Sequence, residues 1–490
     1  MEQTMNAIYE QDAIVAVSTP AGVGGIAVIR LSGADALGIL RKCWKGAALN
    51  EIVSHTAHLG KVVDRNGNIV DEVVITYFKG PKSFTGEDVV ELSCHGSRWI
   101  QREIVNLLTE CGARPAEPGE FTKRAFLNGR LDLAQAEGVI DLISSSSRAA
   151  HRMAMQQASG RLTGHLNALR DKLIDLASLL ELELDFSEEE VEFADRKKLS
   201  DLAEEILGTL RGLARSYATG KVLKEGIPVV IAGAPNAGKS TLLNALLDDD
   251  KAIVSDIPGT TRDIIEDTAE IDGVLFRFAD TAGLRAATDT VEQIGIRKAE
   301  ERLEKASIVL WLLDISTADP QRELEEIRKR IATLPEARHI LLLNKTDKVS
   351  ETNVAAELAA QAKNRVDSLQ SAQEEGFEKT FQATGFEKIF SVSASTGKGI
   401  EELKRTMVEI GYGDYNPESD IMLTNGRHYA AILRGIESLE RVSDALLTGL
   451  SADFIAQDIR HSLHHLSLLT GTISTPDLLS TIFSRFCIGK

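Results

Sequence analysis

A short run in the middle of the chain has the residue types and spacing of a phosphate-binding loop. It reads Gly233-Ala-Pro-Asn-Ala-Gly238-Lys239-Ser240, and it follows the apolar run Val229–Ala232. Glycines in such a loop let backbone N–H groups converge on phosphates at the N-terminus of the next helix. Lys239 adds a point charge, and the Ser240 hydroxyl is suited to ligate Mg²⁺. The predicted nucleotide-binding residues are Asn236, Ala237, Gly238, Lys239, Ser240 and Thr241, with Lys239 also catalytic.

Two further motifs predict which base is bound. Asn344-Lys345-Thr346-Asp347 follows an apolar run, and Asp347 can accept two hydrogen bonds from the guanine N1–H and N2 amine. Adenine lacks that pattern, and a site built on buried hydrogen bonds discriminates by about 10⁴–10⁵. Ser393-Ala394-Ser395 fits a backbone contact to guanine O6. We therefore expect GTP to be preferred over ATP.

A fourth motif, Asp280-Thr281-Ala282-Gly283, ends another apolar run. The carboxylate can hold Mg²⁺ through water, and Gly283 can donate its N–H to a γ-phosphate. In Ras-type enzymes a glutamine orients the attacking water soon after this turn. Leu284 follows Gly283 in this chain and cannot do so. Another carboxylate or an added cation must therefore stabilise the reaction.

The loop before that motif offers oxygen atoms for a cation. It reads Asp256-Ile257-Pro258-Gly259-Thr260-Thr261-Arg262-Asp263, and the predicted nucleotide-binding residues here are Ser255, Asp256, Ile257, Pro258, Gly259, Thr260 and Thr261. Its backbone carbonyls, with the Asn236 amide, could hold a monovalent cation where an arginine finger would otherwise lie, and Thr261 is a candidate second Mg²⁺ ligand. The alternative interpretation of Asn236 is a plain turn residue.

The pattern of apolar residues divides the chain into four expected segments. Residues 1–128 alternate strands and helices, and 226–415 alternate buried strands and helices in the manner of a mostly parallel sheet. Residues 129–225 and 416–490 have the helical period, and neither can bury its apolar stripe alone. The stripe residues are Leu162, Leu166, Leu169, Leu173, Leu176 and Leu180 in the first, and Ile432, Ile436, Leu439, Val442 and Leu446 in the second. We therefore predict an α/β domain, a discontinuous helical domain and an inserted Ras-like P-loop G domain.

The composition limits partners and location. The chain has 55 basic and 73 acidic residues, a formal charge of −18, which argues against a broad non-specific grip on a nucleic-acid backbone. Its four cysteines have no paired short spacing, so a reducing compartment is the simpler interpretation. The start of the chain lacks a signal-peptide pattern, and no apolar run approaches about 18 residues. We expect a cytoplasmic protein without a membrane partner.

Motifs along the whole chain resemble those of the MnmE (TrmE) family of bacterial tRNA-modification GTPases. Besides the nucleotide motifs, they are Ser18-Thr-Pro-Ala-Gly22, Ile29-Arg-Leu-Ser-Gly33, Phe84-Thr-Gly-Glu-Asp88, Pro118-Gly-Glu-Phe-Thr122, Arg124-Ala-Phe-Leu-Asn128, Leu131-Asp-Leu-Ala-Gln-Ala-Glu137 and Phe486-Cys-Ile-Gly-Lys490. The resemblance implies a homodimer whose N-terminal domain binds a 5-formyl-tetrahydrofolate-type one-carbon donor. The implied folate-binding residues are Arg30, Glu87, Arg130 and Lys490.

The resemblance also implies how GTP is hydrolysed and to what end. K⁺ would be held by Asn236, Ser255, Ile257 and Thr260, with Glu292 as the catalytic residue that positions water. An FAD-containing partner, MnmG (GidA), would join the chain to add an aminomethyl or carboxymethylaminomethyl group to the wobble uridine of certain tRNAs. Cys487 is either chemically active or a residue that positions the tail, because reactivity depends on a lowered pKa that a sequence does not reveal.

Two other functions share part of this pattern. A GTPase switch for ribosome assembly would have the nucleotide motifs, but it would not explain the N-terminal motifs or the Cys-Ile-Gly-Lys terminus. A nucleotide-gated structural protein would bind GTP without rapid turnover. Folate binding separates the first alternative from a tRNA-modifying enzyme, and rapid K⁺-stimulated hydrolysis excludes the second.

Overall fold

A computed structural model describes most of the chain. The described residues are 12–185, 196–247, 267–280, 300–317, 320–334, 336–348, 385–413, 415–416, 420–448, 450 and 452–489. They form two compact units, Met1–Ile143 with Met155–Leu210 and Ala430–Lys490, and Ser144–Ala154 with Arg211–Tyr429. The four-segment division remains a prediction.

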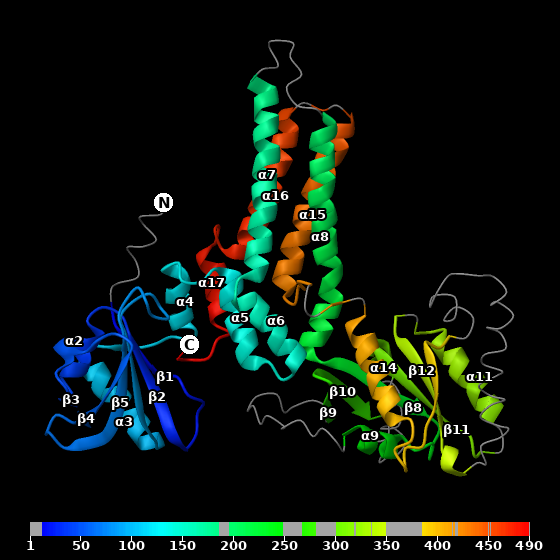
Figure 1. The fold of residues 1–490 in the computed structure, drawn as a ribbon, viewed down its shortest axis with the longest axis horizontal. Helices are drawn as coiled ribbons and strands as arrows, with labels where there is room; N and C mark the ends of the chain where they lie inside the picture. Colours follow the sequence, from blue (N-terminus) through cyan, green and yellow to red (C-terminus); the bar gives the residue numbers. More distant parts are fainter. Residues whose placement is uncertain are drawn as a thin grey trace, which may run out of the picture. The chain divides into compact units, whose positions relative to one another are not determined.

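The N-terminal α/β region is built on a seven-stranded sheet in the order β3-β4-β5-β6-β2-β1-β7 (Figure 1). Its elements are β1 (Ile14–Val17), β2 (Gly24–Ser32), α2 (Ala36–Arg41), β3 (Trp44–Gly46), a 3₁₀ turn (Leu49–Glu51), β4 (Thr56–Val63), β5 (Ile69–Phe78), β6 (Val89–Gly96), α3 (Arg98–Glu110), β7 (Arg114–Pro115) and α4 (Glu120–Leu127). All pairings except β1 with β7 are antiparallel. On β5 buried residues alternate with more exposed ones, the pattern of a sheet with one covered face.

Two turns of this sheet follow from their glycines. The β4–β5 hairpin closes at Asn66-Gly67, where Gly67 has φ of 81°, which favours glycine. Gly22, with φ of 155°, lies in the turn before β2, and the Gly22–Ala27 stretch opens no helix, so it is not a dinucleotide-binding motif.

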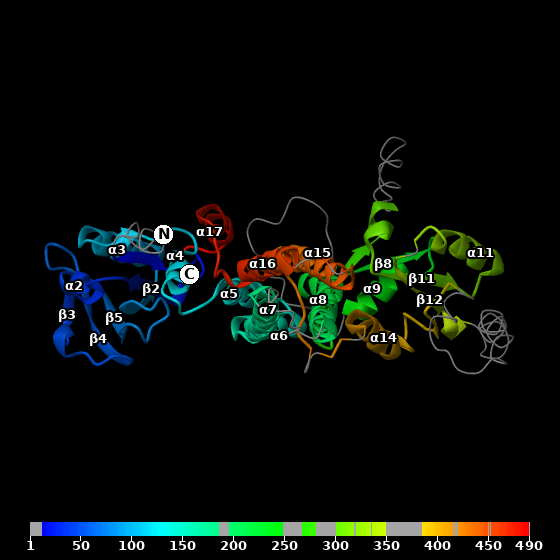
Figure 2. The same ribbon diagram turned by 90° about the horizontal axis from the view of Figure 1, so that it is seen from above.

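The helical bundle brings together segments that lie far apart in the sequence. Its elements are α5 (Leu133–Ser144), α6 (Arg148–Ala158), α7 (Arg161–Asp185), α8 (Arg196–Glu225), α15 (Gly426–Thr448), α16 (Ala452–Thr470) and α17 (Pro476–Phe483). The predicted stripes of α7 and α15 are buried throughout. Helix α7 packs on α16, and Ser443 of α15 donates to Glu204 of α8 at 2.7 Å. Figures 1 and 2 show these four helices side by side, which confirms a discontinuous helical domain.

The P-loop domain contains a six-stranded sheet in the order β13-β12-β11-β8-β10-β9, parallel except for β9. Its elements are β8 (Ile227–Gly233), α9 (Lys239–Leu247), β9 (Asp267–Ile271), β10 (Val274–Asp280), β11 (Ile308–Asp314), α11 (Pro320–Ile331), β12 (Arg338–Asn344), a 3₁₀ turn (Thr346–Lys348), β13 (Lys388–Ser391) and α14 (Ile400–Tyr412). Leucines of α9 and α14 cover one face, and α11 covers the other. Every residue of β11 is buried, as expected of a central parallel strand. The predicted mostly parallel sheet is confirmed.

One buried histidine links two strands of this sheet. His339 of β12 is fully buried, and its Nδ1 accepts a hydrogen bond from Trp311 Nε1 of β11 at 3.1 Å. Its Nε2 lies 2.9 Å from the Leu334 carbonyl. Since Nδ1 accepts and Nε2 donates, the ring is neutral. Burial lowers the pKa of His339 from its ordinary 6.5, although the Leu334 carbonyl acts in the opposite direction.

We predict that His339 makes this unit sensitive to acid. The unfolded chain takes up a proton near pH 6.5 and the folded chain does so only at lower pH, so stability is full above pH 6.5 and is lost as the pH falls through it. Urea unfolding, followed by Trp311 fluorescence with Trp44 and Trp99 replaced by Phe, should show a loss of up to about 1.4 kcal/mol per pH unit. His339→Leu should be less stable at pH 7.5, because Trp311 Nε1 loses its acceptor, but should depend less on pH. Equal pH dependence in both proteins would contradict this role.

Candidate functional site

The predicted phosphate-binding loop lies between β8 and α9, at the carboxyl end of a central strand. Ligands bind at this edge of open parallel sheets. Gly233 and Gly238 have φ of 154° and 103°, and a Cβ on Gly238 would lie 2.6 Å from the Asn344 Nδ2. The loop therefore approaches the next motif too closely for any side chain at that position. Ser240 and Thr241 are exposed in the first turn of α9, as residues that contact phosphate or Mg²⁺ need to be.

Lys239 crosses the loop that it follows. Its Nζ donates to the carbonyls of Gly233 and Ala234 at 2.9 and 2.8 Å. Asn236 has a left-handed φ of 62°, a conformation in which asparagine is enriched. This φ shows that Asn236 forms the turn of the loop, and its exposed side chain is left available for a ligand.

A single buried amide joins three of the predicted motifs. Asn344 ends β12, and its Nδ2 donates to the Ala237 carbonyl of the phosphate loop at 2.7 Å. Its Oδ1 accepts from the Ala394 N–H of the Ser393–Ser395 loop at 3.1 Å. Asn344 therefore uses both ends of its side chain to hold the phosphate loop against the predicted base-binding loop.

Lys345 forms a second link between the same loops. Its Nζ donates to the Asn236 carbonyl at 2.8 Å and pairs with Asp314 Oδ2 at 2.5 Å. Asp314 ends β11, and the pairing lowers its pKa although burial raises it. Asp314 belongs to none of the predicted nucleotide motifs. Its signal was a carboxylate at the buried end of an apolar strand, where a charge needs a partner.

Asp347 faces the Ser393–Ser395 loop. The Ser393 hydroxyl donates to its Oδ1 at 2.7 Å, and this hydrogen bond lowers the pKa of Asp347. Ser393 and Ser395 hydroxyls lie 3.1 Å apart, and Thr346 donates to the Val392 carbonyl at 3.0 Å. An ionised carboxylate next to a backbone turn can accept the hydrogen bonds that guanine donates.

Several predicted residues cannot be placed in this geometry. Asp280 ends β10, and its backbone pairs with Ile231 of β8, close to the phosphate loop. The following predicted site residues lie outside the described residues: Ser255, Asp256, Ile257, Pro258, Gly259, Thr260, Thr261, Thr281, Ala282, Gly283, Glu292 and Lys490. The described edge of the sheet thus brings together the phosphate loop, Asp280, the Asn344–Asp347 motif and Ser393–Ser395.

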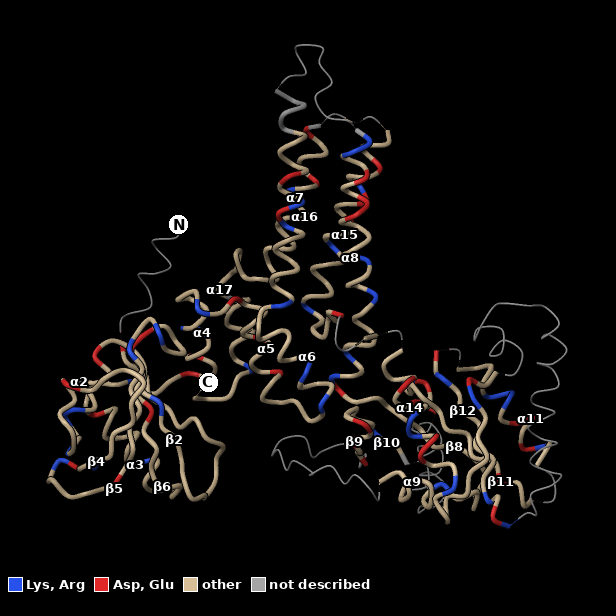
Figure 3. Tube along the Cα trace, in the orientation of Figure 1, with Lys and Arg blue, Asp and Glu red and all other residues tan. Residues whose placement is uncertain are grey.

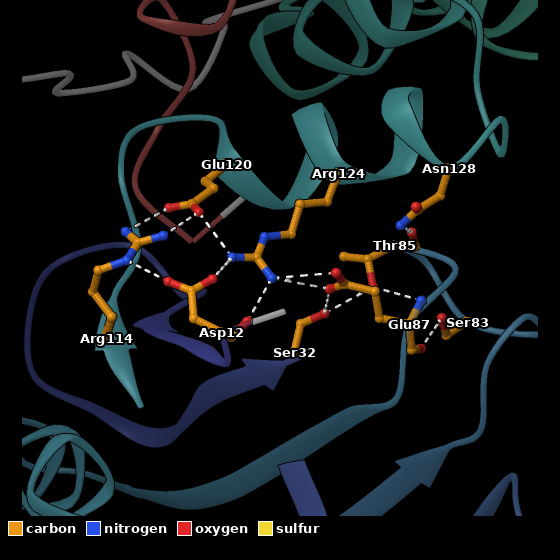
Figure 4. A network of polar contacts seen from close by, with 9 residues as sticks. All are labelled: Asp12, Ser32, Ser83, Thr85, Glu87, Arg114, Glu120, Arg124 and Asn128. Carbon is orange, nitrogen blue, oxygen red and sulfur yellow. Dashed lines mark hydrogen bonds and ion pairs between the residues drawn. The ribbon is translucent and has the colours of Figure 1, made fainter. Parts of the chain in front are cut away.

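The N-terminal region holds a second cluster, around Glu87 (Figure 4). Glu87 accepts from Ser32 Oγ at 2.9 Å and from Arg124 Nη1 at 3.2 Å. Arg30 lies two residues before Ser32 on β2, pairs with Glu91 at 2.8 Å, and stacks on Phe84 and Phe121 at 5.2 and 5.6 Å.

Arg130 lies against the loop that contains Glu87. A Cβ on Gly86 would lie 3.2 Å from Arg130 Cγ, so the exposed Arg130 side chain passes over the residue before Glu87. Of the predicted folate-binding residues, Glu87 therefore lies in the loop that connects β5 to β6, and Arg30 and Arg130 lie against that loop.

A set of charged residues that was not predicted from the sequence holds Glu87 in place, and Arg124 and Glu120 are the buried members. Arg124 of α4 pairs with Asp12 at 2.6 Å and with Glu120 at 3.0 Å besides Glu87, and Arg114 pairs with the same two carboxylates (Figure 4). Burial raises the pKa values of Asp12 and Glu120, but the two guanidinium groups lower both below their ordinary range. The signal in the sequence was a charged residue, Arg124, directly before Ala125, which is fully buried.

The C-terminal tail lies against the same region. The Ser18 hydroxyl donates to the Gly489 carbonyl at 3.0 Å, and the Gly119 N–H donates to the Cys487 carbonyl at 3.4 Å. Gly489 has φ of 97°, and a Cβ there would lie 2.3 Å from the Val17 carbonyl oxygen. Only glycine fits at position 489, where the backbone of the tail passes close to Val17. Cys487 of the tail is exposed.

Comparisons with known proteins agree along the whole chain. A family model described as "MnmE helical domain" matches residues 133–487, and one described as "GTP-binding protein TrmE N-terminus" matches residues 13–130. Proteins named tRNA modification GTPase MnmE are similar to it. The one from Christiangramia forsetii is 46% identical over 98% of this chain and 99% of its own, and the one from Cytophaga hutchinsonii is 47% identical over 98% of each. A crystal structure of Era from Aquifex aeolicus overlaps partially, with 27% identity over 43% of this chain and 65% of that chain and a TM-score of 0.27. With two family models and full-length relatives in agreement, the chain belongs to the MnmE family.

Proposed function

We propose that the chain is a K⁺-dependent GTPase that acts in tRNA modification. Together with an FAD-containing partner of the MnmG (GidA) type, it adds an aminomethyl or carboxymethylaminomethyl group to C5 of the wobble uridine of certain tRNAs. Hydrolysis of GTP is the activity that its relatives' names state, and the four nucleotide motifs support it. The working form in this proposal is a homodimer in a complex with two copies of the partner, in the cytoplasm.

One observation carries the tRNA-modifying part of the proposal. The tail residues Cys487 and Gly489 lie against Gly119 and Ser18, in the region that also contains Arg30 and Glu87. A switch that needs only its nucleotide site has no use for a tail held on a separate α/β region. A one-carbon donor bound there would lie beside the tail, and 5-formyl-tetrahydrofolate fits the charges of Arg30, Glu87 and Arg130.

The charge distribution agrees with a tRNA that is bound jointly by this chain and its partner. The net charge is −18, and Figure 3 shows acidic and basic residues interspersed along the described helices. Such a surface gives little non-specific affinity for a phosphate backbone, so the partner supplies most of the affinity for tRNA. Among the helices within the described ranges, none is both long and apolar enough to cross a bilayer.

In the nucleotide site, each group has a proposed role. Lys239 and the loop N–H groups bind the phosphates, and Ser240 with Thr261 ligates Mg²⁺, which would neutralise phosphate charge. Asn236, with Ser255, Ile257 and Thr260, holds K⁺, while Glu292 positions the attacking water. Asp347 and Ser393–Ser395 bind guanine. The described part of this donor set fits these ligands, since it consists of hydroxyl, amide and carboxylate oxygens and backbone N–H groups at a helix N-terminus.

The modification itself can be measured directly. The purified chain, the FAD-containing partner, GTP, a methylene- or formyl-tetrahydrofolate and a tRNA with uridine at the wobble position should yield a modified uridine by nucleoside mass spectrometry. The same tRNA with cytidine at that position is the matched control. Rapid GTP hydrolysis without any modified nucleoside would favour the ribosome-assembly type of switch instead.

We predict that GTP turnover is much faster in KCl than in NaCl at matched ionic strength. A cation at the position of an arginine finger contributes a rate factor of about 10³–10⁵. Asn236→Ala and Glu292→Ala should still bind GTP but lose most of this hydrolysis, while Lys329→Ala, an exposed residue of α11, should behave as wild type. Equal rates in the two salts would remove the cation mechanism and leave the GTPase assignment intact.

The folate site makes a separate prediction. Glu87→Gln keeps an oxygen for Ser32 but loses the charge, so binding of 5-formyl-tetrahydrofolate should weaken about 10–100-fold, the worth of a charged hydrogen bond. Isothermal titration calorimetry measures this, with Glu72→Gln, an exposed carboxylate on β5, as the matched control. A thermal scan of each variant shows that it is folded. Unchanged affinity in Glu87→Gln would refute the assignment of Glu87.

A further inference from the structure

A carboxylate on α11 contacts the start of the phosphate loop. Glu323 lies in the first turn of that helix, and its Oε1 accepts a hydrogen bond from the Ala234 N–H at 3.3 Å. The carbonyl of the same residue, Ala234, accepts from Lys239 Nζ at 2.8 Å. Ala234 is therefore hydrogen-bonded to both the carboxylate of Glu323 and the ammonium group of Lys239. No nucleotide motif includes Glu323, which lies 89 positions further along the chain.

The surroundings of Glu323 are already acidic. Burial, together with Asp314 and Glu326, raises the pKa of Glu323, and the Ala234 N–H and Lys239 act in the opposite direction. Asp314 is paired with Lys345, and Lys239 is a cation that stabilises the Glu323 carboxylate. Lys239 is also the residue that reaches the β- and γ-phosphates in a loop of this type.

Nucleotide and Glu323 therefore compete for the same positive charge. A bound nucleotide attracts Lys239 and adds several negative charges near the carboxylate. Coupling between two sites is reciprocal, so a carboxylate that a nucleotide disfavours must itself weaken nucleotide binding. The hydrogen bond to Ala234 acts differently, because it fixes the start of the loop whatever the charge of the acceptor.

We infer that Glu323 is a positioning residue of the nucleotide site that also lowers the affinity for guanine nucleotides and speeds their release. Its hydrogen bond holds the loop at Ala234, and its charge opposes the phosphates. The inference rests on the proposed GTPase function and adds a residue that sets how long GDP stays after hydrolysis.

Three variants of the full-length protein separate the two effects. Glu323→Gln removes the charge and keeps an oxygen that accepts from Ala234. Glu323→Ala removes both. Glu326→Gln is the matched control for a nearby charge, because Glu326 is exposed on the same helix and pairs with Arg322 at 3.8 Å. Affinity and dissociation rate are measured with fluorescently labelled GDP, and a thermal scan shows that each variant is folded.

We expect Glu323→Gln to bind GDP about three- to tenfold more tightly than wild type, mainly through slower dissociation, as the Coulomb energy of one unit charge a few ångströms from the phosphates implies. Glu326→Gln should change the affinity by less than about twofold. The gain in Glu323→Gln should shrink as salt is added, because screening weakens a charge effect but not a packing effect. Glu323→Ala should bind less tightly than Glu323→Gln, since the loop has lost its tether.

Each other result has a definite meaning. Unchanged affinity in Glu323→Gln, or an equal gain in Glu326→Gln, would overturn the charge effect. Equal affinity in Glu323→Ala and Glu323→Gln would overturn the positioning role. A wild-type protein that binds no GDP would refute the proposed function itself, whereas a wild type that binds GDP and matches Glu323→Gln refutes only this inference.

Discussion

The nucleotide site depends on the buried side-chain amide of Asn344. It donates to the Ala237 carbonyl at 2.7 Å and accepts from the Ala394 N–H at 3.1 Å, so one residue sets the distance between two loops. A carboxylate in its place could only accept, and an apolar side chain could do neither. Either change would leave a buried backbone group unpaired, which costs about 1–3 kcal/mol. The phosphate-binding and base-binding parts of the site are therefore one structural unit.

Local sequence patterns predicted those strands and motifs whose structure is determined by residues close together in the sequence. Strands β1 and β11 coincide with the apolar runs Ile14–Val17 and Ile308–Leu313, because a short buried strand needs unbroken apolar residues. Strand β9, Asp-Thr-Ala-Glu-Ile, gives no such signal, because a strand at the edge of a sheet needs no apolar run. Asp314 and Glu323 were also missed. Their partners, Lys345 and Ala234, lie 31 and 89 positions away, and only the folded sheet brings them together.

The N-terminal cluster shows the same limit. Motif resemblance named Glu87, but it did not reveal that Arg124 is buried among Glu87, Asp12 and Glu120. Burying a charge is costly unless partners surround it, and removing one partner of such a set typically costs 3–5 kcal/mol. Loss of any of these carboxylates would therefore disturb the shape of the region around Glu87 as well as its charge. Buried pairing of this kind has no periodic signal in a sequence.

The pairing of α7 with α16 has a consequence for how the protein is made. The apolar stripe of α7 is complete by residue 180, but the helix that covers it ends at Thr470. At a synthesis rate of about 5–20 residues per second, the stripe emerges tens of seconds before its partner. The P-loop domain, with its own core, can fold during that interval. The helical domain is completed only after α16 has emerged, and until then the α7 leucines lack the cover that α16 gives them in the folded protein.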